Sequence, residues 1–261
     1  MAFALGPRAQ TAGIRLTAFE TIGSTNAEAL ARVRAGERGP LWLATTHQSA
    51  GRGRRNRAWV SPPGNLAASI IQTIKAPPAV VATLGFAAGL ALDSTLREIA
   101  GEGAASFALK WPNDVLADGK KIAGILIETE TTPEGLAVVV GIGVNVVAAP
   151  DGMPYPVTSL AACGITASAE DVFAALSDAW LEFVTLWDDG RGFQQIRRLW
   201  LARAAGLGKP MAVRSGSVTL QGTFETLDEE GRLVLAEDGG RRMTVAAGEG
   251  ALGAAMSGGA A

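Results

Sequence analysis

The chain has very few of the side chains that build disulfides and zinc sites. Its 261 residues include one cysteine, Cys163, and one histidine, His47. A single cysteine excludes a disulfide within the chain, and a zinc site made of cysteine and histidine would lack ligands. A Ser/His/Asp triad would depend on His47 alone. The scarcity of cysteine fits a reducing compartment.

The chain also lacks the patterns of secretion and membrane insertion. Residues 1–10 contain no basic stretch followed by an apolar one, so they do not read as a signal peptide. The longest apolar run, residues 79–92, contains Thr83, Gly85 and Gly89 and is shorter than the roughly 20 residues of a membrane span. We therefore expect a buried helix there, no membrane contact and a cytoplasmic protein.

Two further absences concern nucleotides and nucleic acids. No Gly-x-x-x-x-Gly-Lys-Ser/Thr stretch occurs, which excludes a P-loop enzyme. The pairs Gly51/Gly53 and Gly141/Gly143 each lack the third glycine of a dinucleotide fingerprint. The net charge is −2, so the protein as a whole is not built to bind nucleic acid and any basic cluster must act locally.

Predicted strands and helices are mixed along the chain without regular alternation. This order favours an α+β fold with a mixed, largely antiparallel sheet flanked by helices. Thr25 and Glu28 have the spacing of a capping box at the start of the first long helix. We expect strands at residues 14–19, 41–45, 66–74, 107–111, around 115, 121–129 and 135–144, and helices at 24–34, 79–99, 170–187 and 193–204.

The pattern of predicted secondary structure changes after residue 206. Short strands separated by tight turns predict a small β-barrel in this part of the chain. The tail is rich in glycine and alanine, which is typical of a flexible segment. We therefore divide the chain into a main domain at residues 1–206, a small β-barrel domain at 207–250 and a flexible tail at 251–261.

An arginine-rich loop at residues 51–57 is the strongest chemical signal. It has the sequence Gly-Arg-Gly-Arg-Arg-Asn-Arg in a chain of net negative charge. Arginine offers a planar fork of donors for phosphate and carboxylate, and the glycines let the backbone approach a ligand closely. Taken alone, the loop fits a nucleotide-binding loop, a solvated basic loop or a nucleic-acid patch.

Two lysines stand near polar turns and apolar strands. Lys110 begins the stretch Lys-Trp-Pro-Asn-Asp, in which it could simply pair with Asp114. Lys121 enters an apolar strand, where a buried ammonium needs a partner and an anionic ligand would supply one. The alternative for Lys121 is a side chain that extends from the strand edge into water.

Two glycines interrupt a later apolar strand. Gly141 and Gly143 weaken the strand unless a ligand must pack against the backbone, and a β-bulge is the alternative explanation.

Together and in this order, these segments resemble biotin–protein ligases. The resemblance covers most of the chain, because the later helices and the small β-domain also look like the family's ending. Five segments carry it: residues 23–26, 48–59, 110–114, 121–128 and 141–145. It implies a class II synthetase-like fold, shared by biotin and lipoate ligases, in a catalytic domain at residues 1–206, followed by an SH3-like barrel.

The resemblance implies a two-step reaction with biotin and MgATP as substrates. Biotin is first converted to biotinyl-5′-AMP, and the biotinyl group then passes to a lysine of a biotin carboxyl carrier protein, a subunit of acetyl-CoA carboxylase. Attack of one anion on another needs neutralised charge, which arginines and a lysine beside Mg²⁺ provide. No metal-binding side chain is assigned, and a homodimer is a further expectation.

The resemblance also implies roles for individual residues. Lys121, Arg54 and Arg55 are expected to be catalytic, and Asp114 is expected on the side of the acceptor lysine. Biotin is expected to contact Ser24, Thr25, Gln48, Gly51, Arg52, Gly124, Gly141 and Gly143. ATP or the adenylate is expected to contact Arg54, Arg55, Trp59, Lys110, Asn113, Lys121 and Asn145.

The sequence departs from the family pattern at three points. Asn56 stands where the family usually has glycine, and asparagine tolerates a left-handed backbone better than other side chains. Tyr155, between Pro154 and Pro156, is the nearest candidate for the aromatic that covers adenine. About 13 residues precede the first strand, so we expect no helix-turn-helix and no binding to DNA.

Two other functions compete with this interpretation. A lipoate or octanoate ligase shares the fold and the adenylate chemistry, but the full arginine loop and the C-terminal β-domain favour biotin. An RNA-binding module would need basic charge spread over one face and exposed aromatic side chains. The β-domain contains Phe224 as its only aromatic residue.

Overall fold

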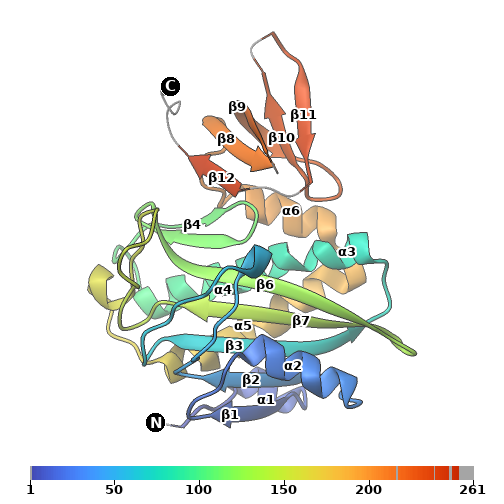
Figure 1. Ribbon diagram of the computed structural model, residues 1–261, viewed down its shortest axis with the longest axis vertical. Helices are drawn as coiled ribbons and strands as arrows, with labels where there is room; N and C mark the ends of the chain where they lie inside the picture. The colour runs from blue at the N-terminus through green and yellow to red at the C-terminus, as the bar shows by residue number, and fades with distance from the viewer. Residues whose placement is uncertain (1, 216, 238, 247–248, 253–261) are drawn as a thin grey trace.

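The structure, a computed structural model, consists of a large sheet flanked by helices and a second, smaller sheet (Figure 1). It describes residues 2–215, 217–237, 239–246 and 249–252. The elements are α1 (Pro7–Thr11), β1 (Arg15–Phe19), α2 (Thr25–Arg34), β2 (Leu41–Thr45), η1 (Arg54–Asn56), β3 (Leu66–Ile74), α3 (Pro78–Ala82), α4 (Leu84–Ala100), β4 (Phe107–Lys110), β5 (Asp114–Ala117), β6 (Lys120–Thr132), β7 (Gly135–Val144), η2 (Ala161–Cys163), α5 (Ala169–Trp187), η3 (Asp188–Gly190), α6 (Phe193–Leu201), β8 (Pro210–Ser215), β9 (Val218–Leu227), β10 (Leu233–Ala236), β11 (Arg242–Val245) and β12 (Glu249–Leu252).

The large sheet has the strand order β1-β2-β3-β7-β6-β5-β4. Only β1 and β2 pair in parallel, because α2 carries the chain back between them; the other neighbours are antiparallel. Every residue of β2 is buried, as expected of a strand covered on both faces. The predicted mixed, largely antiparallel sheet is therefore confirmed.

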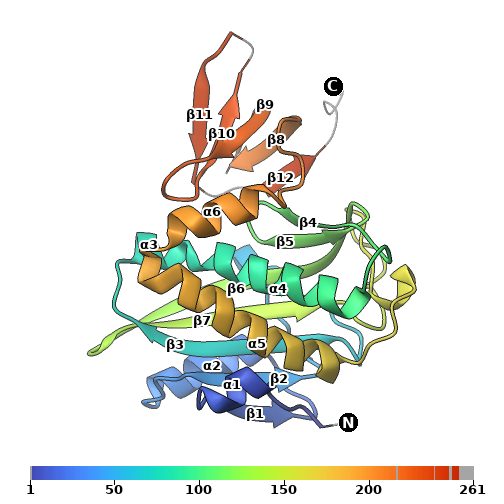
Figure 2. The same cartoon turned by 180° about the vertical axis from the view of Figure 1, so that it is seen from behind.

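Helices cover both faces of the large sheet. α4 and α5 lie side by side across one face (Figure 2), and α2 lies on the opposite face against β3 and β7. The predicted helix over residues 79–99 is divided into α3 and α4 by a break at Thr83. Residues 78–100 are long and apolar enough to cross a membrane, but most of this stretch is buried between the sheet and α5. It is therefore a core helix.

The start of α2 differs from the sequence expectation. Ser24 is the N-cap, and its hydroxyl accepts from the N–H of Ala27 at 3.4 Å. Thr25 already lies within the helix, and Glu28 binds Arg32 one turn later at 2.8 Å. The predicted Thr25/Glu28 capping box is therefore wrong, because the helix begins one residue earlier than that spacing requires.

The smaller sheet is antiparallel, with the order β11-β10-β9-β8-β12, and it lies beyond the β4 edge of the large sheet (Figure 1). The indole of Trp111 donates to the carbonyl of Gly231 at 3.2 Å, and Arg197 donates to the carbonyl of Leu227 at 2.7 Å. These bonds hold the two parts together. β12 ends at Leu252, two residues beyond the predicted boundary, and most of the predicted tail lies outside the described residues.

Candidate active site

A cleft of about 960 Å³ lies on the α2 face of the large sheet. Its walls are the N-terminal end of α2, the arginine loop, the β4–β5 turn and the first two strands of the small sheet. Segments far apart in the sequence therefore meet here. Most of the predicted site residues line it: Ser24, Thr25, Gln48, Arg52, Arg54, Arg55, Trp59, Lys110, Asn113, Asp114, Lys121, Gly124, Gly141 and Gly143.

Strand register places residues with little or no side chain side by side on the floor of the cleft. Gly143 of β7 pairs with Gly124 of β6 on one side and with Ala67 of β3 on the other. The ring of Trp59 lies on this floor, where a Cβ on Gly143 would collide with it and a Cβ on Gly124 would lie 3.3 Å from it. The two glycines therefore leave room for a flat group against the sheet, and Trp59 uses part of that room.

A buried polar network lies at one end of the cleft. The side-chain oxygen of Gln48 accepts from the backbone N–H of Thr25 at 2.8 Å. The hydroxyl of Ser69, on β3, lies 2.7 Å from Thr25 Oγ1 and 2.6 Å from Asn26 Oδ1. A Cβ on Gly141 would collide with the Asn26 side chain, so this glycine accommodates the network as well as the cleft.

The arginine loop is a narrow hairpin. The N–H of Trp59 donates to Gly51 and the N–H of Gly53 donates to Arg57, at 2.9 and 2.8 Å. Gly51 does not line the cleft, because it is buried against the carbonyl of Trp59, where a Cβ would not fit. At the loop tip, Arg55 has a left-handed backbone with φ of 56°.

Two arginines of the loop bind side chains of the sheet region. Arg52 forms an ion pair with Glu128 of β6, and Glu128 also accepts from the amide of Asn26 at 2.9 Å. Arg54 donates to the side-chain oxygen of Asn113 at 3.1 Å, while the amide of Asn113 donates to the carbonyl of Ile125 at 2.7 Å. The loop therefore contacts β6 directly through Arg52 and indirectly through Asn113, which binds Ile125 of β6.

Lys121 lines both the cleft and the small cavity beside it. Its Nζ lies 2.7 Å from Asp114 Oδ1, with both side chains less than one-fifth exposed. The same Nζ lies 5.5 Å from the ring of Trp59 and 5.6 Å from the ring of Tyr155. Asp114 is therefore a partner of Lys121. The position of Tyr155, between two prolines, is also settled: it lines the cleft.

Asn145, like Gly51, is a predicted site residue that does not line the main cleft. It is buried beside a small adjoining cavity of about 20 Å³, which Lys121 and Tyr155 also line. Its amide donates to the carbonyl of Thr158 at 3.0 Å, and its Oδ1 has no hydrogen-bond partner among the described residues. A buried acceptor without a donor is costly, so this oxygen marks a place for a ligand or a water molecule.

Sequence reasoning missed four polar residues that shape the site. Asn26 and Glu128 stood inside the segments that carried the resemblance, and Ser69 is a polar residue in an apolar strand, so each left a signal. Asn65 gave little warning: its buried Oδ1 accepts from the N–H groups of Val146, Val147 and Ala148 and holds the loop that follows β7.

The cleft has an excess of positive charge. Asp114 is the one carboxylate among its described lining residues. The lining cations are Arg52, Arg54, Arg55, Arg57, Lys110, Lys121 and Arg214.

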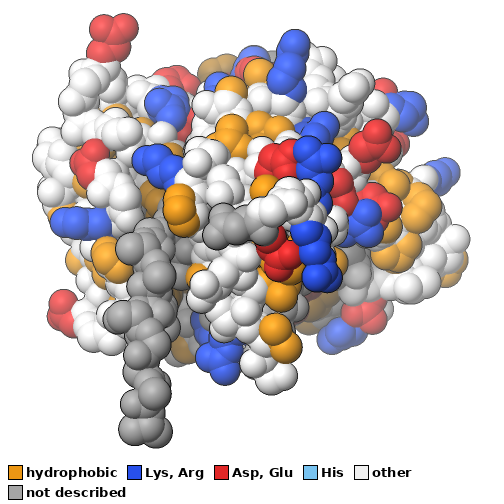
Figure 3. Space-filling model, turned by 90° about the horizontal axis from the view of Figure 1, so that it is seen from above, with side chains coloured by type: hydrophobic (Ala, Val, Ile, Leu, Met, Phe, Trp, Pro, Cys, Tyr) orange, Lys and Arg blue, Asp and Glu red, His pale blue; other side chains and the backbone are white. Residues whose placement is uncertain are grey.

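On the face seen from above, basic and acidic side chains are interspersed and no broad basic surface forms (Figure 3). On this face, the distribution differs from the one that an RNA-binding module would need.

Fold and site together define an α+β protein with a cationic, glycine-floored cleft, suited to an enzyme that binds anionic substrates. The profile of the Biotin/lipoate A/B protein ligase family matches residues 19–145, and that of the Biotin protein ligase C terminal domain matches residues 206–250.

Relatives and solved structures agree with these matches. The biotin–[acetyl-CoA-carboxylase] ligase of Paracoccus denitrificans is 42% identical over 86% of this chain and 95% of its own length. That of Mycobacterium tuberculosis is 34% identical over 87% of this chain and 85% of its own. The biotin protein ligase of Aquifex aeolicus, solved with biotin and ATP, has the same fold, with a TM-score of 0.75, 24% identity and coverage of 92% and 99%.

This chain belongs to the biotin–protein ligase family. The prediction of an ATP-dependent biotin ligase is thereby confirmed, and the lipoate or octanoate alternative is not favoured.

Proposed function

We propose that this cleft activates biotin with MgATP and transfers the biotinyl group to a lysine of a biotin carboxyl carrier protein. The observation that carries the proposal is the convergence of Lys121 and the arginine loop on one glycine-floored cleft. Two anionic substrates can meet there because the surrounding cations lower their mutual repulsion. Cytoplasmic location and a homodimer remain predictions.

The polar end of the cleft is assigned to the biotin head group. Its ureido ring carries donors and a carbonyl acceptor, which a network of hydroxyl and amide groups around Thr25 and Gln48 can match. Ser24 and the backbone of the arginine loop complete this end, and the bare floor at Gly124 and Gly143 admits a flat bicyclic ring. The biotin carboxylate then points toward Lys121.

In the first step a carboxylate oxygen of biotin attacks the α-phosphorus of ATP. A carbon–oxygen–phosphorus anhydride forms, the bond to the β-phosphate oxygen breaks, and pyrophosphate leaves. Lys121 stabilises the charge at the reacting oxygens, and Arg54 and Arg55 stabilise the phosphates. Mg²⁺ arrives with the triphosphate, whose oxygens are its preferred ligands. The nucleotide base is assigned to the side of Tyr155, Trp59 and Asn145, with Lys110 and Asn113 nearby.

In the second step the acceptor lysine attacks the acyl carbon of the adenylate. The amide bond forms, the bond to the phosphate oxygen breaks, AMP leaves and the attacking amine loses a proton. Asp114 is the carboxylate in position to attract the incoming ammonium group, with Lys121 neutralising the phosphate that departs. A closed arginine loop keeps water from the anhydride between the two steps.

The test offers the purified protein biotin or lipoate together with MgATP and a biotin carrier domain. We expect the carrier to gain one biotinyl mass and the reaction to release pyrophosphate and AMP. A lipoyl increment without a biotinyl one would contradict the assignment of substrate, and pyrophosphate release without any modified carrier would contradict the second step. A carrier whose acceptor lysine is replaced by arginine is the control.

A further inference from the structure

Glu128 is a charged residue that the reaction does not use. It lies on β6 just outside the lining of the cleft, with a side chain that is 26% exposed. One of its oxygens binds the guanidinium of Arg52, and the other accepts from the amide of Asn26 at 2.9 Å. Glu128 therefore joins the base of the arginine loop to the polar network at the biotin end.

The ion pair distinguishes Arg52 from the other arginines of the loop. The guanidinium of Arg52 is engaged by Glu128, so it is held against β6. Arg54 instead points to Asn113 across the cleft. The base of the loop is thus anchored, and the tip at η1 carries the cations that meet the ligand.

From this arrangement we propose that Glu128 is a positioning residue that holds the arginine loop closed over the adenylate and couples closure to an intact biotin-end network. This rests on the proposed function of the cleft. Glu128 contacts no substrate: it acts through Arg52, which fixes the loop base, and through Asn26, which contacts Ser69 beside Thr25. Release of the adenylate is governed by loop opening, so loss of the ion pair accelerates release more than it slows adenylate formation.

Glu128→Gln separates the two contacts of the carboxylate. The amide oxygen of glutamine still accepts from Asn26, while the neutral side chain no longer forms a salt bridge with Arg52. Glu130→Gln is the matched control, because Glu130 lies two residues further along β6 and pairs with Arg34 outside the cleft. Arg52→Gln removes the same ion pair from the other side and leaves the Glu128–Asn26 bond in place.

The experiment measures two properties of each full-length variant after biotinyl-5′-AMP has formed from biotin and MgATP. One is the rate of adenylate release on dilution, and the other is the rate of trypsin cleavage at Arg54, Arg55 and Arg57, which all these variants retain. We expect Glu128→Gln and Arg52→Gln each to raise both rates about five- to ten-fold. The double variant should add little, and Glu130→Gln should match the wild type.

The outcomes separate the inference from the proposed function. A wild-type protein that forms no adenylate contradicts the proposed function. A wild type that forms it, with Glu128→Gln behaving as Glu130→Gln does, contradicts the role of Glu128. Thermal unfolding controls for a general loss of structure, and should Glu128→Gln misfold, unchanged release from Arg52→Gln overturns the inference instead.

Discussion

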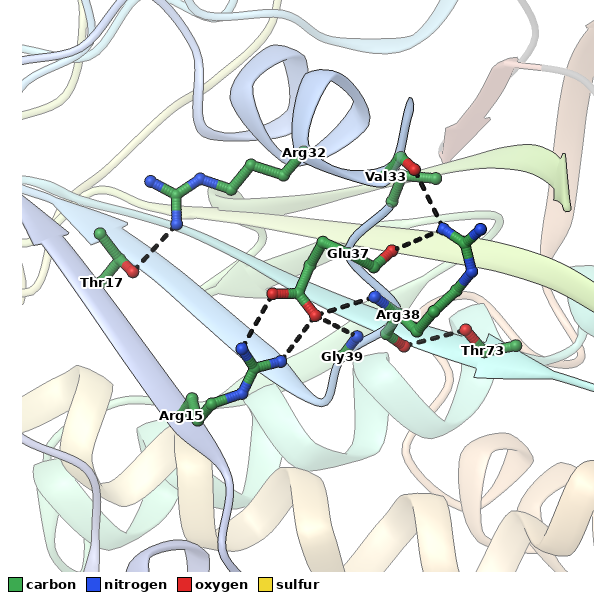
Figure 4. Close-up of polar contacts among 8 residues, drawn as sticks. All are labelled: Arg15, Thr17, Arg32, Val33, Glu37, Arg38, Gly39 and Thr73. Atoms are coloured by element: carbon green, nitrogen blue, oxygen red, sulfur yellow. Dashed lines mark hydrogen bonds and ion pairs between the residues drawn. The ribbon is translucent and has the colours of Figure 1, made fainter. Parts of the chain in front are cut away.

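Two arginine-rich regions of this protein differ in their local balance of positive and negative side chains. At the corner between α2 and β2, Glu37 accepts two hydrogen bonds from Arg15, at 2.6 and 2.9 Å, and one each from the backbone N–H groups of Arg38 and Gly39 (Figure 4). Arg38 in turn pairs with Glu134 on the β6–β7 hairpin at 2.7 Å. Arg15 and Arg38 in this corner therefore each have a carboxylate partner within the fold.

In the cleft the cations outnumber the single lining carboxylate, Asp114, among the described residues. Such an arrangement repels itself and costs stability unless an anion arrives. The comparison teaches that balanced arginines belong to the architecture, whereas an excess of cations around a concave floor points to a ligand. Within the arginine loop itself, Arg52 is balanced by Glu128.

The largest effect is expected from removing Lys121, the lysine that pairs with the lining carboxylate of the cleft. Lys121→Ala should reduce adenylate formation about 10²- to 10³-fold, because the developing charge at the reacting oxygens loses its nearest ammonium. Pyrophosphate release with biotin and MgATP measures it. Lys120→Ala is the matched control, because Lys120 is exposed on the same strand. Near-normal pyrophosphate release from a folded Lys121→Ala protein would refute the role of Lys121.

A smaller effect is expected from the loop tip. Arg54→Ala combined with Arg55→Ala should speed release of the bound adenylate about ten-fold, because each arginine supplies charge-assisted hydrogen bonds to phosphate oxygens. A rapid-dilution assay measures it. The control is Arg241→Ala with Arg242→Ala, two arginines that pair with Glu237 and Glu225 on the small sheet. Equal release from both double variants would contradict the prediction.

The smallest effect concerns the balanced corner. The pKa of Glu37 is lowered from 4.5 to about 2, chiefly by the hydrogen bonds from Arg15 and also by the N–H groups of Gly39 and Arg38, while burial acts in the opposite direction. Because Arg15 is more than half exposed, we discount the shift and expect Glu37→Gln to lower the free energy of unfolding by about 1–2 kcal/mol at pH 7.

The pH dependence of that effect has a definite sign. A carboxylate whose pKa is lower in the folded protein stabilises the fold above its ordinary pKa and loses this contribution as the pH falls toward the folded value. The difference in unfolding free energy between wild type and Glu37→Gln should therefore shrink from about pH 5 to pH 2, as denaturant titrations can measure. Reduced adenylate formation by Glu37→Gln at neutral pH would contradict the separation of the two regions.

Most of the fold could be predicted from local patterns. Apolar runs indicated the strands of the large sheet, and short strands between tight turns indicated the small sheet apart from β12. Local patterns failed where two neighbouring residues could serve the same purpose. Ser24 and Thr25 can both cap a helix, and the choice of Ser24 leaves Thr25 to bind Gln48.

The sequence by itself determined which chemical groups this protein can bring to a ligand: the arginine loop, Lys121 and the paired glycines are all readable from residue type and order. Only the tertiary structure decided which of these groups meet. Strand register puts Gly124 beside Gly143, and the pairing of β5 with β6 brings Lys121 to Asp114. The packing of distant segments joins Arg52 to Glu128, 76 residues away. Partner choice among many charged residues depends on distances of a few ångströms between such segments, and these distances exist only once the sheet has formed.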